Sequence, residues 1–208
     1  DICIITDRNK YIPTYKKILE YHEIPSALFM DEVLTNNAVI LVIKNLINLV
    51  EYVNRNIFDD KFRYLFTSIA RSFIYNYDDD FIYQTTINKD YQNTDIITTC
   101  KKVDINNPLL TIINDIIDKF KIYEKLTNLT DIEKNIVRIN NLISIANTLS
   151  NLGYSTLEFV NYLDETIEKE LPVKYSESAP TANAVKIMNI HKSKGLEFSL
   201  CYFTGMHN

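Results

Sequence analysis

The chain has 208 residues, of which 46% are hydrophobic and 24% are charged, a balance typical of a packed globular protein rather than a disordered one. Its formal net charge of -5 argues against an autonomous duplex binder with a broad basic face, because phosphate neutralisation needs clustered Lys and Arg. Any contact with DNA must therefore be local.

The amino end predicts a strand, a helix and a second strand in that order. Residues 2–6 form a β-branched apolar run, and Tyr15, Ile18 and Leu19 then recur at helical spacing. Residues 24–29 can supply the next strand. A β-α-β order is typical of a parallel sheet, although it leaves the order of the strands within the sheet open.

The middle of the chain predicts helices only. From about residue 38 to 53, apolar residues occur on several faces, so we expect a buried helix that bridges two domains. Further helices are expected at 62–74 and 108–123, with a poorer segment at 80–87. We therefore expect a mostly helical chain.

Two helix starts are marked by residue pairs with the spacing of a capping box. Thr130 is followed three residues later by Glu133, and Ser155 by Glu158. In such a pair, the hydroxyl and the carboxylate satisfy free backbone N–H groups at the start of the helix. The apolar stripe after the first pair predicts one long helix from 131 to about 152.

The predicted elements describe one domain interrupted by another. Pro172 and the polar segment 176–181 end the helical block, and the strand signal returns after them. We therefore predict an α/β fold with a large all-α insertion. Residues 1–57 and 179–208 supply the partial parallel sheet, and residues 58–178 form the inserted helical domain.

The strongest local signal lies near the carboxyl end. Val185 and Ile187 alternate with more polar neighbours, which predicts a strand directly before a polar turn. Ligands usually bind at the carboxyl ends of strands in open α/β sheets. The residues in this position to meet a phosphate-bearing partner are His191, Lys192, Ser193 and Lys194.

The residues after the turn have separate expected roles. Gly195 has no Cβ, so its backbone N–H can approach a ligand closely. The Glu197 carboxylate can accept hydrogen bonds from a ribose hydroxyl or orient a base or a metal-bound water. We expect Leu196 and Phe198 to anchor this corner in the core, followed by a second buried strand at 200–203.

Two kinds of chemistry are not expected from this chain. Asp78, Asp79 and Asp80 are consecutive, point in different directions and suit a solvated helix cap, so we predict no metal site there. The sequence also contains no Gly-x-x-x-x-Gly-Lys-[Ser/Thr] phosphate loop. We therefore expect the chain alone to bind neither ATP nor Mg²⁺ and to lack ATPase activity.

The run from 185 to 198 resembles motif V of the UvrD/RecB/AddA-like superfamily 1 DNA helicases. The family pattern is a strand ending in Thr-x-His, followed by Lys-x-Lys-Gly-Leu-Glu-Phe, and Asn189 stands here in place of the Thr. The resemblance implies that His191 and the backbone of the turn face the phosphates of single-stranded DNA. It places Glu197 and Gly195 on the nucleotide side.

The helical block is similar to the all-helical insertion within the second RecA-like domain of the same family. The resemblance thus implies a fragment of an ATP-dependent DNA helicase that couples ATP hydrolysis to single-strand translocation and duplex unwinding in DNA repair or recombination. It implies ATP and Mg²⁺ as cofactors of the full-length protein. The implied partners are single-stranded and duplex DNA, the rest of the helicase chain, and a nuclease or helicase partner subunit.

A second hypothesis is a non-enzymatic helical protein-interaction module on an α/β scaffold, which the acidic charge favours. Both hypotheses fit a cytoplasmic protein. No apolar run approaches the ~18 to 20 residues that span a bilayer. The cysteines Cys3, Cys100 and Cys201 are odd in number and far apart, which favours reduced thiols over disulfides or zinc ligands.

Overall fold

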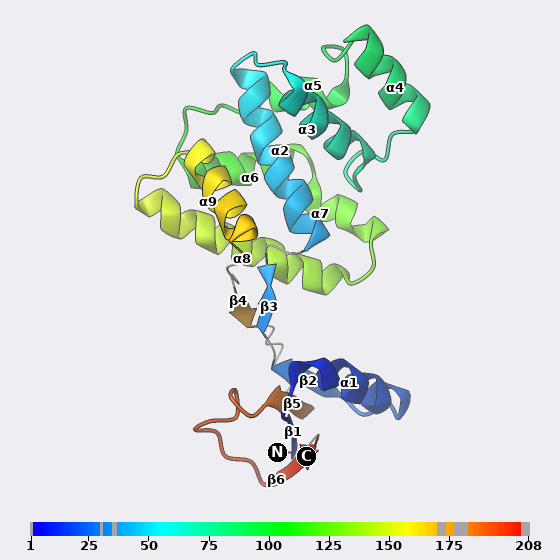
Figure 1. Cartoon of the computed structure of the whole chain (residues 1–208), viewed down its shortest axis with the longest axis vertical. Coiled ribbons are helices and arrows are strands. Elements are labelled where there is room, and N and C mark those ends of the chain that lie inside the picture. Colours follow the sequence, from blue (N-terminus) through cyan, green and yellow to red (C-terminus); the bar gives the residue numbers. More distant parts are fainter. Residues whose placement is uncertain (1, 30, 35–36, 170–173, 177–182, 205–208) are drawn as a thin grey trace. The chain divides into compact units, whose positions relative to one another are not determined.

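A computed structural model of the chain describes residues 2–29, 31–34, 37–169, 174–176 and 183–204 (Figure 1). The chain divides into two compact units. The first, which we call the sheet unit, comprises Asp1–Val33 and Lys174–Asn208. The second, the helical unit, comprises Leu34–Val173. An α/β fold with a large all-α insertion, as predicted from the sequence, is confirmed.

The sheet unit contains a 4-stranded parallel sheet in the order β2-β5-β1-β6. Its strands are β1 (Ile2–Thr6), β2 (Ser26–Phe29), β5 (Val185–Asn189) and β6 (Leu200–Thr204). The predicted strands at the amino end and before the polar turn are therefore confirmed. Strand β5 lies between β1 and β2, so the two ends of the sequence build one sheet.

Helix α1 (Ile12–Tyr21) makes the connection that two parallel strands require, between β1 and β2. It follows a short 3₁₀ helix, η1 (Asn9–Tyr11), and it buries the side chain of Ile12 completely. A proline in its first turn suits a helix start, where backbone N–H groups have no partner within the helix. The predicted strand-helix-strand order is confirmed.

The core of the sheet is small. Cys3, Ile5 and Met188 are buried together, with Phe29 and Phe198 packed against them. These residues come from three adjacent strands and from the segment after β5, which explains why neither end of the sequence could form this core alone.

A separate antiparallel pair joins the chain where it leaves and re-enters the sheet unit. Strand β3 (Asp31–Val33) pairs with β4 (Lys174–Ser176), and Glu32 lies opposite Tyr175. The sequence pattern predicted neither strand. Most of the predicted polar linker, residues 177–181, lies outside the described residues.

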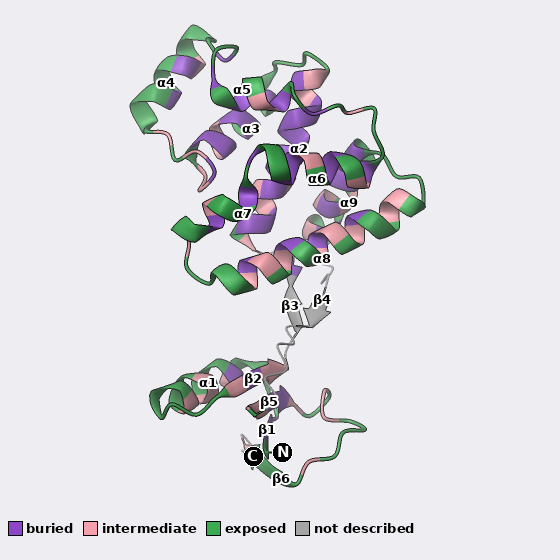
Figure 2. Ribbon diagram, turned by 180° about the vertical axis from the view of Figure 1, so that it is seen from behind, coloured by how far each residue is buried: buried purple, intermediate pink, exposed green. Residues whose placement is uncertain are grey.

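The helical unit is built around α2 (Ala38–Asn54), which is buried along most of its length (Figure 2). The other elements are α3 (Asp60–Arg71), α4 (Asp79–Asn88), α5 (Asp95–Cys100), α6 (Leu109–Lys119), α7 (Ile122–Lys125), η3 (Leu126–Asn128), α8 (Ile132–Asn151) and α9 (Thr156–Glu168). Helix α2 packs against α3, α5, α8 and α9. Its burial on several faces is confirmed.

The observed division of the chain differs from the domain limits expected from the sequence, which were 57/58 and 178/179. It falls at 33/34 and 173/174, so α2 belongs to the helical unit rather than acting as a bridge. The reason is packing, because the apolar faces of α2 are covered by other helices of that unit.

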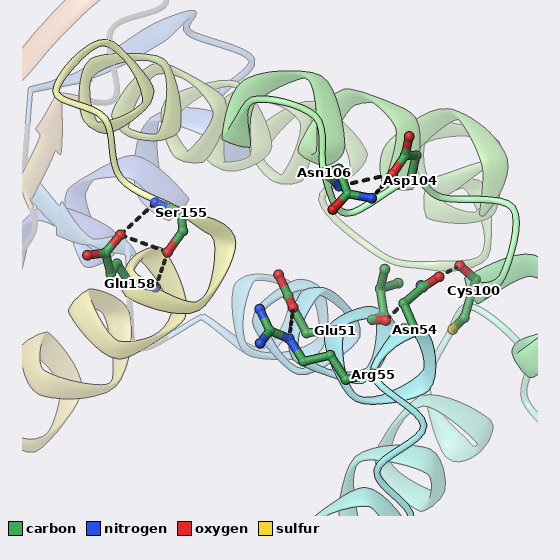
Figure 3. Close-up of polar contacts among 9 residues, drawn as sticks. Glu51, Asn54, Arg55, Cys100, Asp104, Asn106, Ser155 and Glu158 are labelled. Atoms are coloured by element: carbon green, nitrogen blue, oxygen red, sulfur yellow. Dashed lines mark hydrogen bonds and ion pairs between the residues drawn. The ribbon is translucent and has the colours of Figure 1, made fainter.

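One of the two expected capping boxes forms. The Ser155 hydroxyl accepts from the Glu158 backbone N–H at 3.3 Å, and the Glu158 carboxylate accepts from the Ser155 N–H at 2.8 Å (Figure 3). At Thr130 the prediction is wrong, because Asp131 is the N-cap of α8 in a left-handed conformation, with φ 58° and no side-chain cap. The long helix itself is confirmed.

Buried polar groups of the helical unit are paired locally (Figure 3). The almost fully buried Glu51 carboxylate accepts from the Arg55 side chain at 2.7 Å, one turn along α2. The Asn54 amide donates to the Cys100 carbonyl at 3.0 Å, which ties α2 to the end of α5. Among the described residues, no helix is long and apolar enough to cross a membrane.

Candidate nucleic-acid interface

The candidate site lies at the carboxyl edge of the parallel sheet. The last residues of three strands are in register, because Thr6 of β1 pairs with Asn189 of β5 and with Thr204 of β6. Parallel strands end at the same edge, so the loop after β1 and the turn after β5 lie next to each other. This edge is where open α/β sheets bind their ligands.

The turn after β5 is held by a short network of hydrogen bonds. The Ile190 N–H donates to the Thr6 carbonyl at 3.1 Å, which fixes the start of the turn to β1. The Asn189 side-chain carbonyl accepts from the Lys192 N–H at 2.9 Å, and the Asn189 backbone carbonyl accepts from the Ser193 N–H at 3.2 Å. Asn189 therefore organises the turn through its side chain and its backbone.

The loop after β1 contacts the same asparagine. The Asn189 side-chain amide donates to the side-chain oxygen of Asn9 at 2.7 Å. Thr6 is buried, and its hydroxyl donates to the Arg8 carbonyl at 3.1 Å. The Arg8 guanidinium lies 3.5 Å from the Asp7 carboxylate. The two loops at this edge are thus joined by direct bonds.

The structure brings together the four residues that the sequence placed in contact with DNA. His191 and Lys194 are exposed, and Lys192 and Ser193 are half-buried. The Ser193 hydroxyl donates to the Ile190 carbonyl at 3.0 Å, so its donor is used within the turn and its oxygen can still accept. The turn offers two ammonium groups and an imidazole on a stretch of four residues.

Gly195 takes a left-handed conformation with φ 80°, which a residue with a side chain rarely adopts. A Cβ at this position would meet no atom within 4 Å, so the space beside this glycine is open. The following residue closes the turn, because the Leu196 N–H donates to the Ser193 carbonyl at 3.1 Å. Glu197 is exposed beside it.

Two expectations about the corner are wrong. The Leu196 side chain does not anchor it in the core, since 51% of that residue is exposed. The second strand is not buried either, because β6 lies at the edge of the sheet, and its residues Leu200, Tyr202 and Phe203 are exposed. Phe198 does pack against the core, where the Lys186 ammonium lies 5.4 Å from the centroid of its ring.

The aspartates at 78–80 serve structure, as predicted. Asp78 caps α4 by accepting from the Phe81 N–H at 2.8 Å, and Asp79 pairs with Arg71 at 2.8 Å. Within the described ranges, no group of three or more His, Cys, Asp or Glu residues could hold a metal ion.

Asn9 and Thr6 are the site residues that the sequence pattern missed. Both follow from the position of β1 beside β5, a pairing of segments about 180 residues apart that no local pattern encodes. The available signal was the Asp-Arg-Asn run directly after an apolar strand.

The fold and the site define an α/β domain with a polar, cation-bearing turn at the carboxyl edge of its sheet and an all-helical insertion. The chain belongs to the UvrD-like helicase family, because the family model described as the UvrD-like helicase C-terminal domain matches residues 1–208. The resemblance stated from the motif is confirmed at this level.

The chain is also 32% identical over 98 residues to the large ATP-dependent helicase/nuclease chain of Lactobacillus helveticus (strain DPC 4571). The matched segment covers 45% of this chain and 8% of that protein. The chain is therefore a helicase-family domain that spans a small part of this relative's length.

Proposed function

We propose that this chain is part of an ATP-dependent DNA helicase and that its sheet unit contacts single-stranded DNA through the turn at 191–194. The observation that carries the proposal is the exposed, cationic turn at the carboxyl edge of a parallel sheet, within a chain of the UvrD-like helicase family. Membership of that family makes DNA the expected partner.

The chemistry of the turn suits a phosphodiester backbone. Lys192 and Lys194 supply ammonium groups, and the His191 imidazole can donate a hydrogen bond to a phosphate oxygen. Such contacts position a strand without reading its bases, as a protein that translocates along DNA requires. The open space beside Gly195 leaves the backbone of the turn accessible.

The charges of the two units support this assignment. The sheet unit has eight basic and eight acidic residues, whereas the helical unit has fourteen basic and nineteen acidic residues. A polyanion is repelled less by the sheet unit, so local cationic groups there can decide the contact.

The nucleotide would be bound mainly by parts of the full-length protein that this sequence does not contain. Glu197 is our candidate for a hydrogen bond to the nucleotide sugar, and Gly195 for the close approach beside it. No phosphate loop occurs in the sequence, so ATP and Mg²⁺ require other segments, and we expect no ATP hydrolysis by the isolated chain.

In the full-length protein, ATP hydrolysis would drive translocation on single-stranded DNA and unwinding of duplex DNA, in repair or recombination. The name of the relative joins helicase and nuclease activities, which supports a nuclease domain or a partner protein with that activity. We place this protein in the cytoplasm, in keeping with the free state of its three cysteines.

The test uses two histidines of the full-length protein. We expect His191→Ala to weaken the stimulation of ATP hydrolysis by single-stranded DNA. His22 follows α1 and precedes the amino end of β2, away from the candidate edge, so His22→Ala is the matched control and should leave the stimulation unchanged. Equal behaviour of the two variants would remove His191 from the DNA contact.

The second candidate, a protein-interaction module, is favoured by the acidic helical unit. It predicts that single-stranded DNA neither binds the sheet unit nor stimulates any activity. The salt dependence of DNA affinity separates the two candidates, because only phosphate contacts release counterions.

A further inference from the structure

The side chain of Asn189 makes two hydrogen bonds that serve different parts of the site. Its carbonyl oxygen accepts from the Lys192 N–H at 2.9 Å, inside the turn. Its amide nitrogen donates to the Asn9 side-chain oxygen at 2.7 Å, across to the loop after β1. One planar group thus joins the conformation of the turn to that of the neighbouring loop.

The chemistry of the amide fixes this arrangement. A primary amide carries an acceptor and two donors on one short group, so it can satisfy a backbone N–H and a carbonyl oxygen at the same time. Turning the Asn189 amide round would place its donor against the Lys192 N–H and its acceptor against Asn9 Oδ1, which loses both bonds. The hydroxyl of a Thr has less reach, and an apolar residue makes neither bond.

The same edge of the sheet receives a third connection, because the Ile190 N–H donates to the Thr6 carbonyl at 3.1 Å. The turn is therefore held at its start by the backbone of β1 and through its Asn189 side chain by Asn9. The cationic groups of His191 and Lys192 lie directly after these anchors in the sequence.

We propose that Asn9 and Asn189 form a positioning pair that holds the DNA-facing turn in place and couples it to the loop after β1. This inference rests on the proposed function for the turn. Neither asparagine needs to touch DNA. A movement of the loop at 7–9 is transmitted through Asn9 to the backbone N–H groups and cations of the turn.

The experiment uses Asn9, because its substitution leaves the bond within the turn intact. In the full-length protein, Asn9→Ala removes the acceptor, whereas Asn9→Asp keeps an acceptor oxygen and adds a negative charge. We expect Asn9→Ala to raise the concentration of single-stranded DNA that half-saturates ATP hydrolysis by about two- to tenfold, the range for one hydrogen bond. The maximal rate at saturating DNA should be unchanged.

The aspartate variant separates positioning from direct contact. If Asn9 positions the turn, Asn9→Asp should restore most of the DNA response. If Asn9 itself lies against the phosphates, the added charge should make Asn9→Asp worse than Asn9→Ala. That order of the two variants would overturn the inference.

Hydrogen exchange in the full-length protein without DNA or nucleotide gives a readout independent of the proposed function. We expect Asn9→Ala to speed the exchange of amides in a peptide covering 189–196, and Asn9→Asp to do so less. Asn141 is an exposed asparagine on α8, so Asn141→Ala is the control and should leave this peptide unchanged.

Unchanged exchange in Asn9→Ala would overturn the positioning role, whatever the turn binds. Faster exchange with an unaltered DNA response would instead keep the positioning pair and remove the proposed DNA contact. The two failures are therefore distinguishable.

Discussion

The sheet unit and the helical unit use their residues in opposite ways. The helical unit buries large aromatic side chains, among which Phe62, Phe66, Phe120 and Phe159 are almost completely inaccessible. The sheet unit has a three-residue core and leaves its edge strand and its polar turn exposed. Stability is therefore concentrated in the helical unit, and accessible chemistry in the sheet unit.

A small parallel sheet can present a ligand site more openly than a set of packed helices. The described side chains of the helical unit include paired groups within its own surface, such as Asp78 at the start of α4. At the carboxyl edge of the sheet, a whole turn with two lysines and a histidine projects from the strand ends instead. The charge difference between the units points the same way.

We expect the greatest loss of stability from removing a buried aromatic ring in the helical unit. Phe62 is buried, and its ring centroid lies 4.8 Å from that of Phe58 and 4.9 Å from that of Tyr91. We expect Phe62→Ala to lower the free energy of unfolding by about 3 to 5 kcal/mol, because a cavity remains. Urea denaturation measures this change.

The control lies on the same helix. Tyr64 is 64% exposed, so Tyr64→Ala should change the free energy of unfolding by less than about 0.5 kcal/mol. A similar loss from both variants would mean that the helical unit does not hold the dominant core, and the contrast between the units would fail.

Thiol reactivity distinguishes the units at single atoms. Burial raises the pKa of Cys3 to about 11 and also raises the pKa of Cys100, whereas Cys201 is exposed. Since the thiolate is the reactive form, only about one Cys3 thiol in 10³ is ionised at pH 8. We expect iodoacetamide to modify Cys201 first, as measured by peptide mass spectrometry.

Raising the pH separates the two buried thiols. Modification of Cys3 should increase as the pH approaches 11, while Cys100 should stay protected until the helical unit unfolds. Rapid modification of Cys100 in the folded protein at pH 8 would contradict its burial.

A smaller change in stability is expected at the two capping sites. Ser155→Ala removes a formed cap and should cost about 1 kcal/mol of unfolding free energy. Thr130→Ala is the matched control and should cost much less, because α8 begins without a side-chain cap. Thermal or urea unfolding measures both, and equal losses would show that Thr130 caps the helix after all.

The capping box also predicts a pH dependence. The backbone N–H and the hydroxyl of Ser155 lower the pKa of the Glu158 carboxyl. A depressed folded-state pKa gives stability that is present above the unfolded pKa of about 4.3 and is lost as the pH falls through the folded pKa. The difference between Ser155→Ala and the wild type should therefore shrink below about pH 4.

Local patterns predicted the elements that depend on neighbouring residues. The strand before the turn, the buried helix near residues 38–53 and the cap at Ser155 are confirmed because period and capping act over a few residues. The cap expected at Thr130 failed because Asp131 turns into a left-handed conformation there. A correct spacing of residue types does not fix the backbone angles that a cap needs.

The site was predicted in part for the same reason. The order of residues 191–194 placed four polar groups after a strand, and the structure places them together at the end of β5. The partner loop could not be predicted, because the bond between Asn9 and Asn189 depends on which strands are neighbours. Leu196 was misplaced because an apolar residue in a turn carries no local sign of which side faces water.

The order of amino acids was enough to establish the family, the strand-turn-corner motif and the alternation of α/β and helical segments, since each is written in nearby residues. The strand order β2-β5-β1-β6, the place of α2 in the helical unit and the exposure of β6 became known from the folded chain alone. These features follow from packing between segments far apart in the chain, where the burial of apolar surface and the pairing of backbone groups are settled together.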